Sequence, residues 1–306
     1  MNKVAADLLK ERYPDAVRSI QLSEWTTWQV GGPAISIVVS STGMLSDLLG
    51  VLRQEGIQWF LIGRGSNILA SDDGCSSIII RLAGDLATVR WEHSGSRWKL
   101  SCGGGTRFPS MSGVACSKGA SGLTFAIGIP GTVGGAVFMN AGAYGSSIKD
   151  ILTEVDVVDS DGNERVIRNT ECGFSYRSSR FQKEALIVTG AMFLLNKADP
   201  AVLRSEAKRI LQLRREKFPL EYPNAGSVFR KPFEGPPPGK LIEDSGLKGR
   251  TVGGAMVSEK HANFIVNTGH ASSYDILELV NVVREEVMKM SGILLKEEIR
   301  YLGRRG

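Results

Sequence analysis

A glycine-rich stretch at residues 128–145, GIPGTVGGAVFMNAGAYG, constrains the fold of this chain more than any other segment. Six of its eighteen residues are glycine, and none is Lys, Arg, Asp or Glu. Glycine inside a helix or strand costs roughly 0.5–1 kcal/mol relative to alanine, so the run predicts irregular backbone with positive φ angles or close neighbours. Apolar residues such as Val133 and Phe138 distinguish it from a flexible linker. We therefore expect an ordered loop whose backbone amides bind an anion, most commonly phosphate.

Two further glycine turns, at residues 63–65 and 103–105, precede this loop. The first lies after a predicted strand, but it is not the dinucleotide fingerprint GxGxxG, because Asn67 and Ile68 follow it. Taken alone it fits an ordinary surface turn equally well. Three such turns are more than a single phosphate would contact, so together they favour a long ligand with a diphosphate, such as a dinucleotide.

The length of 306 residues suggests two or three domains. No apolar run approaches the ~18–20 residues of a membrane span, and residues 1–10 lack a signal-peptide core. We therefore expect a cytoplasmic protein without membrane contact. The four cysteines are scattered and form no CxxC pair, which predicts neither disulfides nor a metal site.

The net charge of +5 raises the possibility of a nucleic-acid partner. Its basic residues are spread along the chain among acids, with only short clusters around Arg214 and Arg215 and at Arg304 and Arg305. This distribution favours attraction for small polyanionic ligands over nucleic acid.

Apolar spacing and turn residues predict a series of helices and strands along the chain. Helices are expected at residues 4–12, 45–56, 108–118, 199–217 and 274–290, the last capped by Ser272. Strands are expected at residues 34–40, 58–62, 78–81, 87–91, 98–101, 151–158, 165–167 and 186–194, with a strand pair in 253–267 and a closing strand at 293–302.

Candidates for acid–base chemistry are few, since the chain has only three histidines, His93, His261 and His270. It also has neither a metal motif nor a nucleophile elbow. Redox chemistry carried by a bound cofactor is therefore the economical interpretation.

At this point the sequence resembles a known family. Residues 129–144, IPGTVGGAVFMNAGAY, preceded by GRGSN at 63–67, resemble the FAD-binding domain of the UDP-N-acetylenolpyruvoylglucosamine reductases (MurB), which belong to the vanillyl alcohol oxidase-like flavoproteins. The resemblance continues through FSYRS at 174–178, NAGSVF at 224–229, GLKG at 246–249, VSEKHANFIVN at 257–267 and EIR at 298–300, and so covers nearly the whole chain.

The resemblance implies an α+β fold in three parts: FAD-binding subdomains at residues 1–82 and 83–198, and a smaller substrate-binding domain at residues 199–306. It implies non-covalent FAD, NADPH as the hydride donor, and reduction of UDP-N-acetylglucosamine-enolpyruvate to UDP-N-acetylmuramate in cytoplasmic peptidoglycan synthesis. This step serves cell wall biogenesis, cell shape and division. The expected form is a monomer. The residues that match the family's FAD-binding segments are Gly63, Arg64, Gly65, Ser66, Asn67, Gly128, Pro130, Gly131, Thr132, Gly134, Gly135, Asn140, Gly142 and Ala143.

Three residues match the family's catalytic positions. Hydride addition to an alkene conjugated to a carboxylate leaves enolate charge, which requires a cation or acid nearby and a proton donor at the other carbon. Arg177 matches the arginine that stabilises this charge, although a surface arginine is the alternative. Ser227 matches the proton donor, although a serine in a turn often bonds backbone groups instead.

The third position is Glu298. Alternation in the predicted closing strand places it with Lys296 and Arg300, on the face opposite Glu297. A solvated face would explain this pattern, but the family places its catalytic glutamate here, where it assists the enol.

Tyr176, Lys217 and Asn224 match substrate-binding positions, with Arg214 and Arg215 close enough to compete with Lys217. Two departures stand out. Lys231 occupies a position where some members carry a substrate-binding asparagine, so that role is not carried over. The segment after Tyr176 is short, which is typical of the family branch that lacks an extra substrate-covering loop.

Two other functions stay open at this stage. One is a flavin oxidase of the same superfamily; such oxidases often bind flavin covalently through His or Cys, and the glycine turns contain no histidine. The other is a basic, non-enzymatic protein that binds nucleic acid or senses a nucleotide.

Overall fold

The first structural unit is a four-stranded sheet in the order β1-β2-β5-β3, covered on one face by two helices. The structure is a computed structural model and describes residues 3–303. Leucines at helical spacing in α2 pack on Ile78 and Ile80, and Ser41 caps α2 by accepting from the Met44 amide at 3.2 Å. The elements are α1 (Lys3–Arg12), β1 (Val17–Gln21), β2 (Pro33–Val39), α2 (Thr42–Gln54), β3 (Trp59–Leu61) and β5 (Ile78–Leu82).

The second unit is a five-stranded antiparallel sheet in the order β11-β10-β12-β7-β6. Helices α3 and α4 pack on it, and Phe108, Val137 and Phe193 lie at the centre of its core. Its elements are β6 (Val89–Ser94), β7 (Arg97–Gly103), α3 (Phe108–Lys118), α4 (Val133–Phe138), β10 (Leu152–Asp159), β11 (Glu164–Arg168) and β12 (Leu186–Asn196).

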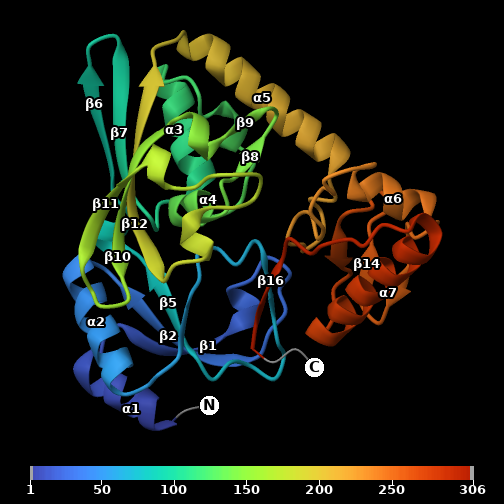
Figure 1. The fold of residues 1–306 in the computed structure, drawn as a ribbon, viewed down its shortest axis with the longest axis horizontal. Helices are drawn as coiled ribbons and strands as arrows, with labels where there is room; N and C mark the ends of the chain where they lie inside the picture. The colour runs from blue at the N-terminus through green and yellow to red at the C-terminus, as the bar shows by residue number, and fades with distance from the viewer. Residues whose placement is uncertain (1–2, 304–306) are drawn as a thin grey trace.

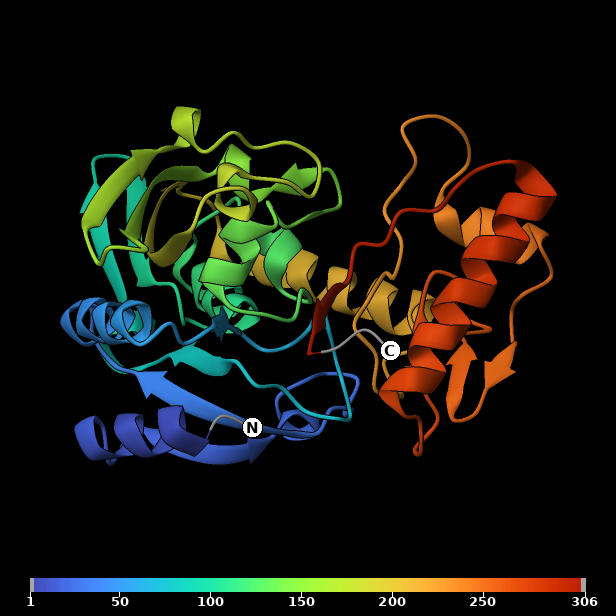
Figure 2. The ribbon, with the colours of Figure 1, turned by 60° about the horizontal axis from the view of Figure 1, so that its bottom comes forward.

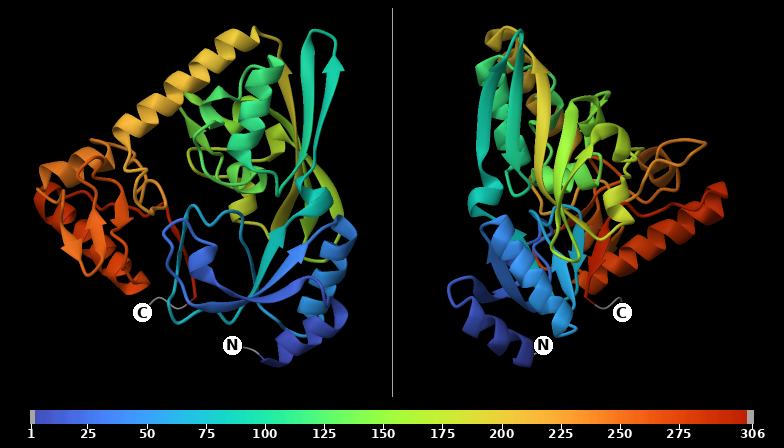
Figure 3. Two further views of the ribbon diagram at one scale, coloured as in Figure 1. Left: turned by 180° about the vertical axis from the view of Figure 1, so that it is seen from behind. Right: turned by 60° about the vertical axis from the view of Figure 1, so that its left-hand side comes forward.

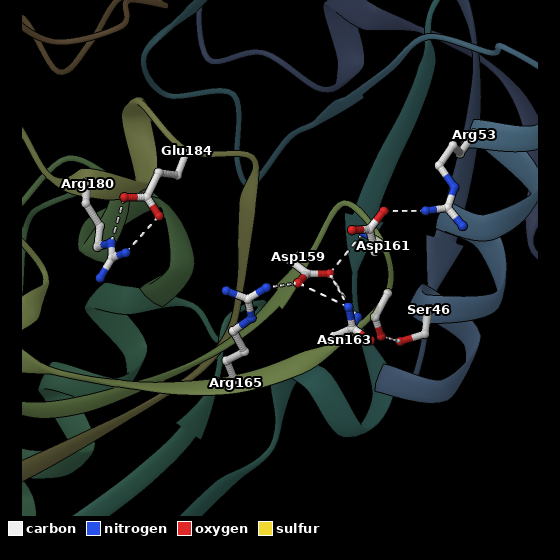
Figure 4. Close-up of polar contacts among 9 residues, drawn as sticks. Ser46, Arg53, Asp159, Asp161, Asn163, Arg165, Arg180 and Glu184 are labelled. Atoms are coloured by element: carbon white, nitrogen blue, oxygen red, sulfur yellow. Dashed lines mark hydrogen bonds and ion pairs between the residues drawn. The ribbon is translucent and has the colours of Figure 1, made fainter.

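A polar seam joins these two units, from α2 to the turn between β10 and β11 (Figure 4). Ser46 Oγ donates to the Gly162 carbonyl at 2.7 Å, and Arg53 pairs with Asp161. Asp159 holds the turn itself, because its carboxylate accepts from the backbone amides of Asp161 and Asn163 at 2.9 and 3.0 Å. The seam fixes how the two sheets meet.

The third unit is a separate lobe, which the long helix α5 joins to the rest of the molecule (Figures 1 and 3). Asp199 caps α5 by accepting from the Ala201 amide at 2.7 Å. In the lobe, α7 packs on a three-stranded sheet, is capped by Ser272 and ends at Gly292 with φ +71°. Its elements are α5 (Pro200–Lys217), α6 (Pro238–Asp244), β13 (Thr251–Val252), β14 (Ala255–Val257), β15 (Ile265–Asn267) and α7 (Ser273–Ser291).

The chain then returns from this lobe to the first unit, where β16 (Arg300–Leu302) pairs in parallel with β4 (Ile68–Ala70), as Figures 1 and 2 show. Trp28, which is fully buried, donates from Nε1 to the Ile265 carbonyl at 2.8 Å and accepts at its own carbonyl from Asn267 Nδ2 at 2.9 Å. The third lobe is therefore anchored by backbone pairing and buried hydrogen bonds.

Most predicted elements are confirmed, but the closing strand is wrong in length. Only residues 300–302 form a strand, while residues 293–299 have no regular secondary structure apart from one isolated bridge between Phe229 and Glu297. The prediction also missed β1 and β4, which are short and carry weak alternation. The predicted divisions at residues 82 and 198 stay a prediction.

The glycine-rich stretch is also more regular than predicted, since it contains α4 and a small hairpin of β8 (Gly142–Ala143) and β9 (Ser146–Ser147). Thr132 caps α4 by accepting from the Gly135 amide at 3.3 Å. A Cβ on Gly134 would lie 3.0 Å from the Gly104 carbonyl oxygen and 3.2 Å from that of Val188. Glycine is required in α4 because the helix approaches other backbone closely, and this contact could not be read from the local sequence.

Candidate active site

Two glycine-rich segments face each other where the first two units meet. Ser66 Oγ donates to the Pro130 carbonyl at 3.0 Å, and a Cβ on Gly63 would lie only 2.7 Å from Thr132 Oγ1. Within residues 3–303, none of the backbone amides of residues 63–67 donates a hydrogen bond. Five consecutive open amides form an anion-binding concavity. This turn therefore fits a diphosphate.

Two other residues that were predicted to contact the cofactor, Asn140 and Gly128, make contacts within the protein. Asn140 donates from Nδ2 to the Ser175 carbonyl at 2.9 Å and accepts at Oδ1 from the Lys149 amide at 3.1 Å. A Cβ on Gly128 would lie 2.2 Å from Cδ of Arg214, so this glycine makes room for an arginine of α5. The remaining predicted residues, Arg64, Gly65, Gly131, Gly135, Gly142 and Ala143, lie on the same two segments.

The central feature of the site is an ion pair between lobes. Arg177 Nε donates to Glu298 Oε1 at 2.8 Å, and its Nη2 donates to the Gly142 carbonyl at 3.2 Å. Glu298 is held in place because its amide donates to the Val228 carbonyl at 2.7 Å and its carbonyl accepts from Asn67 Nδ2 at 3.0 Å. The alternative of a solvated glutamate is wrong, since only 13% of the Glu298 side chain is exposed.

Arg177 has an unusual backbone conformation, with φ +52°. The left-handed region costs a residue with a Cβ on the order of 1–3 kcal/mol and is found mainly where the surroundings hold the residue for function. Gln182 Nε2 donates to the Arg177 carbonyl at 3.0 Å and supports this conformation. The preceding residue, Tyr176, is 57% exposed, and its ring centroid lies 5.3 Å from the guanidinium carbon.

Burial raises the pKa of the Glu298 carboxyl above its ordinary value, although Arg177 and Arg230 oppose this effect. A carboxyl with a raised pKa retains its proton to higher pH and can donate a hydrogen bond or a proton. The site thus combines a cation with an acid.

Ser227 lies in the turn before Val228, the residue that bonds the Glu298 amide. Gly226, with φ +75°, precedes it, and Asn224 Oδ1 accepts from the Gly226 amide at 2.9 Å. Asn224 Nδ2 donates to the carbonyls of Pro219 and Tyr222, so its side chain shapes the turn. The Ser227 hydroxyl makes no hydrogen bond to any other described residue and is available to a ligand.

Lys217 ends α5 and is exposed, with no ion pair to the described residues. Lys231 lies across from Tyr176, because its backbone amide is 3.5 Å from the tyrosine hydroxyl. A cavity of about 420 Å³ opens beside Tyr176 and Arg177, and its lining also includes Asn140, Gly142 and Ala143.

Two further arginines, Arg230 and Arg300, lie near this site, and the sequence motifs assign no role to either. Burial, followed by the nearby charge of Arg230, lowers the pKa of Arg300, whose guanidinium carbon lies 4.8 Å from the Phe138 ring centroid. Arg230 Nε is buried without a hydrogen-bond partner in the described chain. No local signal marks Arg230, because its position depends on the return of the last segment beside residues 227–230.

Comparisons with known proteins agree with this architecture. Residues 33–168 match the model of an FAD binding domain, and residues 218–302 match that of the UDP-N-acetylenolpyruvoylglucosamine reductase C-terminal domain. No helix within residues 3–303 is long and apolar enough to cross a membrane.

Full-length relatives carry the same name. The chain is 41% identical to the UDP-N-acetylenolpyruvoylglucosamine reductase of Heliobacterium modesticaldum, over 93% of this chain and 90% of the relative. It is 39% identical to that of Caldanaerobacter subterraneus, over 99% of both chains. The crystal structure of this reductase from Thermus caldophilus superimposes with a TM-score of 0.80 at 34% identity, covering 94% of this chain and 98% of the other.

Proposed function

Since the chain belongs to the UDP-N-acetylenolpyruvoylglucosamine reductase family, we propose that it is an FAD-dependent reductase that uses NADPH to convert UDP-N-acetylglucosamine-enolpyruvate to UDP-N-acetylmuramate. The observation that carries this proposal is the largely buried pair of Arg177 and Glu298, in which the Glu298 backbone carbonyl accepts from Asn67 at the end of the open-amide turn of residues 63–67.

The residues present fit FAD. Residues 63–67 offer their amides to its diphosphate, and the segment from Pro130 to Gly135 lies opposite them. When bound, FAD supplies the hydride chemistry, taking a hydride from NADPH and delivering it to the substrate. The protein's own residues bind the two substrates, orient the alkene, stabilise the negative charge that develops on it and donate a proton to it.

Charge develops on the substrate carboxylate as the hydride arrives. Arg177 stabilises this charge, and Glu298 in its protonated form donates to the enol oxygen. Ser227 then gives its proton to the neighbouring carbon, which completes the lactyl ether. A serine hydroxyl is a weak acid, so a nearby cation such as Lys217 is required to assist it.

Substrate binding is assigned to three residues, of which Tyr176 lines the cavity. Tyr176 contributes an exposed aromatic ring at its rim, and Lys217 a free ammonium at the end of α5. Asn224 acts through the turn that presents Ser227. We further propose that the enzyme is a monomer in the cytoplasm and serves peptidoglycan synthesis.

One experiment tests the reaction directly. The protein is reduced with NADPH without oxygen, the enolpyruvyl sugar nucleotide is added, and flavin absorbance is followed. Stoichiometric reoxidation with formation of the lactyl ether is expected. Rapid reoxidation by oxygen but none by this substrate would indicate the flavin oxidase instead. A purified protein without flavin would favour the non-enzymatic sensor.

A further inference from the structure

Arg230 presents a free guanidinium beside the reacting pair. Within residues 3–303 it makes no side-chain hydrogen bond and no ion pair, and its Nε is buried. An unsatisfied buried donor costs about 1–3 kcal/mol, and such groups are rare in native proteins. The cost is offset if a ligand supplies the acceptor.

The position of Arg230 in the site is set by the backbone. Its amide donates to the Lys296 carbonyl at 2.8 Å, and two residues earlier the Val228 carbonyl accepts from the Glu298 amide at 2.7 Å. The charge of Arg230 acts on both Glu298 and Arg300. The side chain therefore lies within the charged cluster.

The cluster has an excess of positive charge. Arg177 and Arg230 act on a single carboxylate, that of Glu298, and Arg300 lies close enough to Arg230 to be affected by its charge; only Arg177 pairs with Glu298. Even with Glu298 ionised, the formal charge of these four residues is +2. An anionic ligand is needed to balance the cluster.

Arg177 already donates from Nε to Glu298 and from Nη2 to the Gly142 carbonyl, which leaves it fewer donors for a substrate carboxylate. Arg230 keeps all its donors, and a free guanidinium binds a carboxylate through two parallel hydrogen bonds. We propose that Arg230 binds the carboxylate of the enolpyruvyl group together with Arg177, which also holds Glu298 in position. This assignment rests on the proposed function.

The test compares two ligands that differ in the carboxylate. UDP-N-acetylmuramate carries it, and UDP-N-acetylglucosamine does not. Binding of each is measured by isothermal titration calorimetry to the FAD-loaded wild-type protein, Arg230→Met, Arg230→Lys and the control Arg250→Met, whose side chain is on an exposed turn. Binding does not require turnover, so failure of the reductase reaction itself is detected separately by the flavin reoxidation assay.

For Arg230→Met we expect affinity for UDP-N-acetylmuramate to fall about 10- to 100-fold, with less than about a twofold change for UDP-N-acetylglucosamine. Arg230→Lys should recover part of the lost affinity, because lysine keeps the positive charge but not the two parallel N–H donors of the guanidinium. The melting temperature of the ligand-free Arg230→Met protein should be unchanged or higher, since a half-buried cation with an unsatisfied Nε is removed.

Equal loss of affinity for both ligands would overturn the assignment and place the diphosphate at Arg230. Unchanged affinity for both would also overturn it. A lower melting temperature with unchanged affinities would show that Arg230 serves the fold alone.

Discussion

Arg177 and Glu298 are joined by a 2.8 Å ion pair although they are 121 residues apart and belong to different lobes. Arg177 comes from the loop beside β8, and Glu298 from the segment that returns to β4 as β16. The pair therefore forms only when the last lobe is anchored. Fold and chemistry are coupled through this contact.

Glu298→Gln should reduce the rate of substrate reduction about 10²- to 10⁴-fold, the range typical of a lost acid–base group, while FAD stays bound. Glutamine keeps the shape but cannot donate a proton. Stopped-flow measurement of flavin reoxidation by the enolpyruvyl substrate checks this.

Glu297→Gln is a matched control, because the Glu297 side chain is also 13% exposed but pairs with Arg284 at 3.0 Å, away from Arg177. Its reoxidation rate should stay within about threefold of wild type. Equal losses in the two variants would assign the effect to general damage of the segment.

Ser227→Ala should separate the two half-reactions. Reduction of the flavin by NADPH needs no proton from Ser227 and should stay within about twofold of wild type, whereas reoxidation by substrate should slow by about 10²-fold or more. Both rates are measured by stopped flow under nitrogen. A parallel loss in both would contradict the proton-donor role and indicate a positioning role for the turn.

Part of this site could be predicted from sequence because its signals are local. Alternation along the predicted strand separates Glu298 from Glu297; only residues 300–302 form that strand, but the two glutamates do have different partners, Arg177 and Arg284. The partners could not be predicted, since each comes from a distant segment. Helix caps such as Ser41 and Ser272 were likewise within reach, because a cap needs only neighbouring residues.

Long-range packing accounts for what was missed. Gly134 of α4 lies close to the backbone of Gly104, which follows β7, and of Val188 in β12, so composition alone predicted a loop. Arg230 also shows no special sequence context, and its importance follows from an unpaired Nε in the folded protein. Parallel pairing of β16 with β4 joins the last described segment to residues 68–70 and leaves no short-range signature.

Gly63→Ala should weaken FAD binding by about tenfold or more. The added Cβ would meet Thr132 Oγ1 at 2.7 Å and push apart the two segments that flank the open amides. Gly50→Ala on α2 is the control, since nothing lies within 4 Å of its Cβ and alanine favours a helix by up to about 1 kcal/mol. FAD titration of the apoprotein gives both affinities, and equal affinities would exclude this turn as part of the cofactor site.

Asp159→Asn should lower the melting temperature near neutral pH. The amide of Asn163, followed by Asn163's side chain, the amide of Asp161 and Arg165, stabilises the ionised form and lowers the pKa of Asp159. A lowered native pKa gives stability that is present above the unfolded pKa, ~3.9, and is lost as the pH falls through the native value. The difference between wild type and variant should therefore shrink in acid.

Asp161→Asn is the control for that series, because its pair with Arg53 is more than half exposed on both sides and exposed pairs contribute little. Its melting temperature should follow wild type at every pH. If the Asp159→Asn difference were constant from neutral to acid, ionisation of Asp159 would not be its cause.

Trp28→Phe tests whether the last lobe must be anchored for catalysis. The substitution removes the hydrogen bond from Nε1 to the Ile265 carbonyl and leaves that carbonyl without this donor, which should cost about 1–3 kcal/mol in free energy of unfolding. Trp91→Phe is the control, since the Trp91 indole N–H donates no hydrogen bond to any described residue. Urea denaturation measures the free energy of unfolding of both variants.

Because the lobe carries Glu298, the Trp28 variant should also slow flavin reoxidation by substrate while reduction by NADPH changes less. Reduced stability with both half-reactions at wild-type rates would show that β16 alone suffices to hold Glu298 against Arg177.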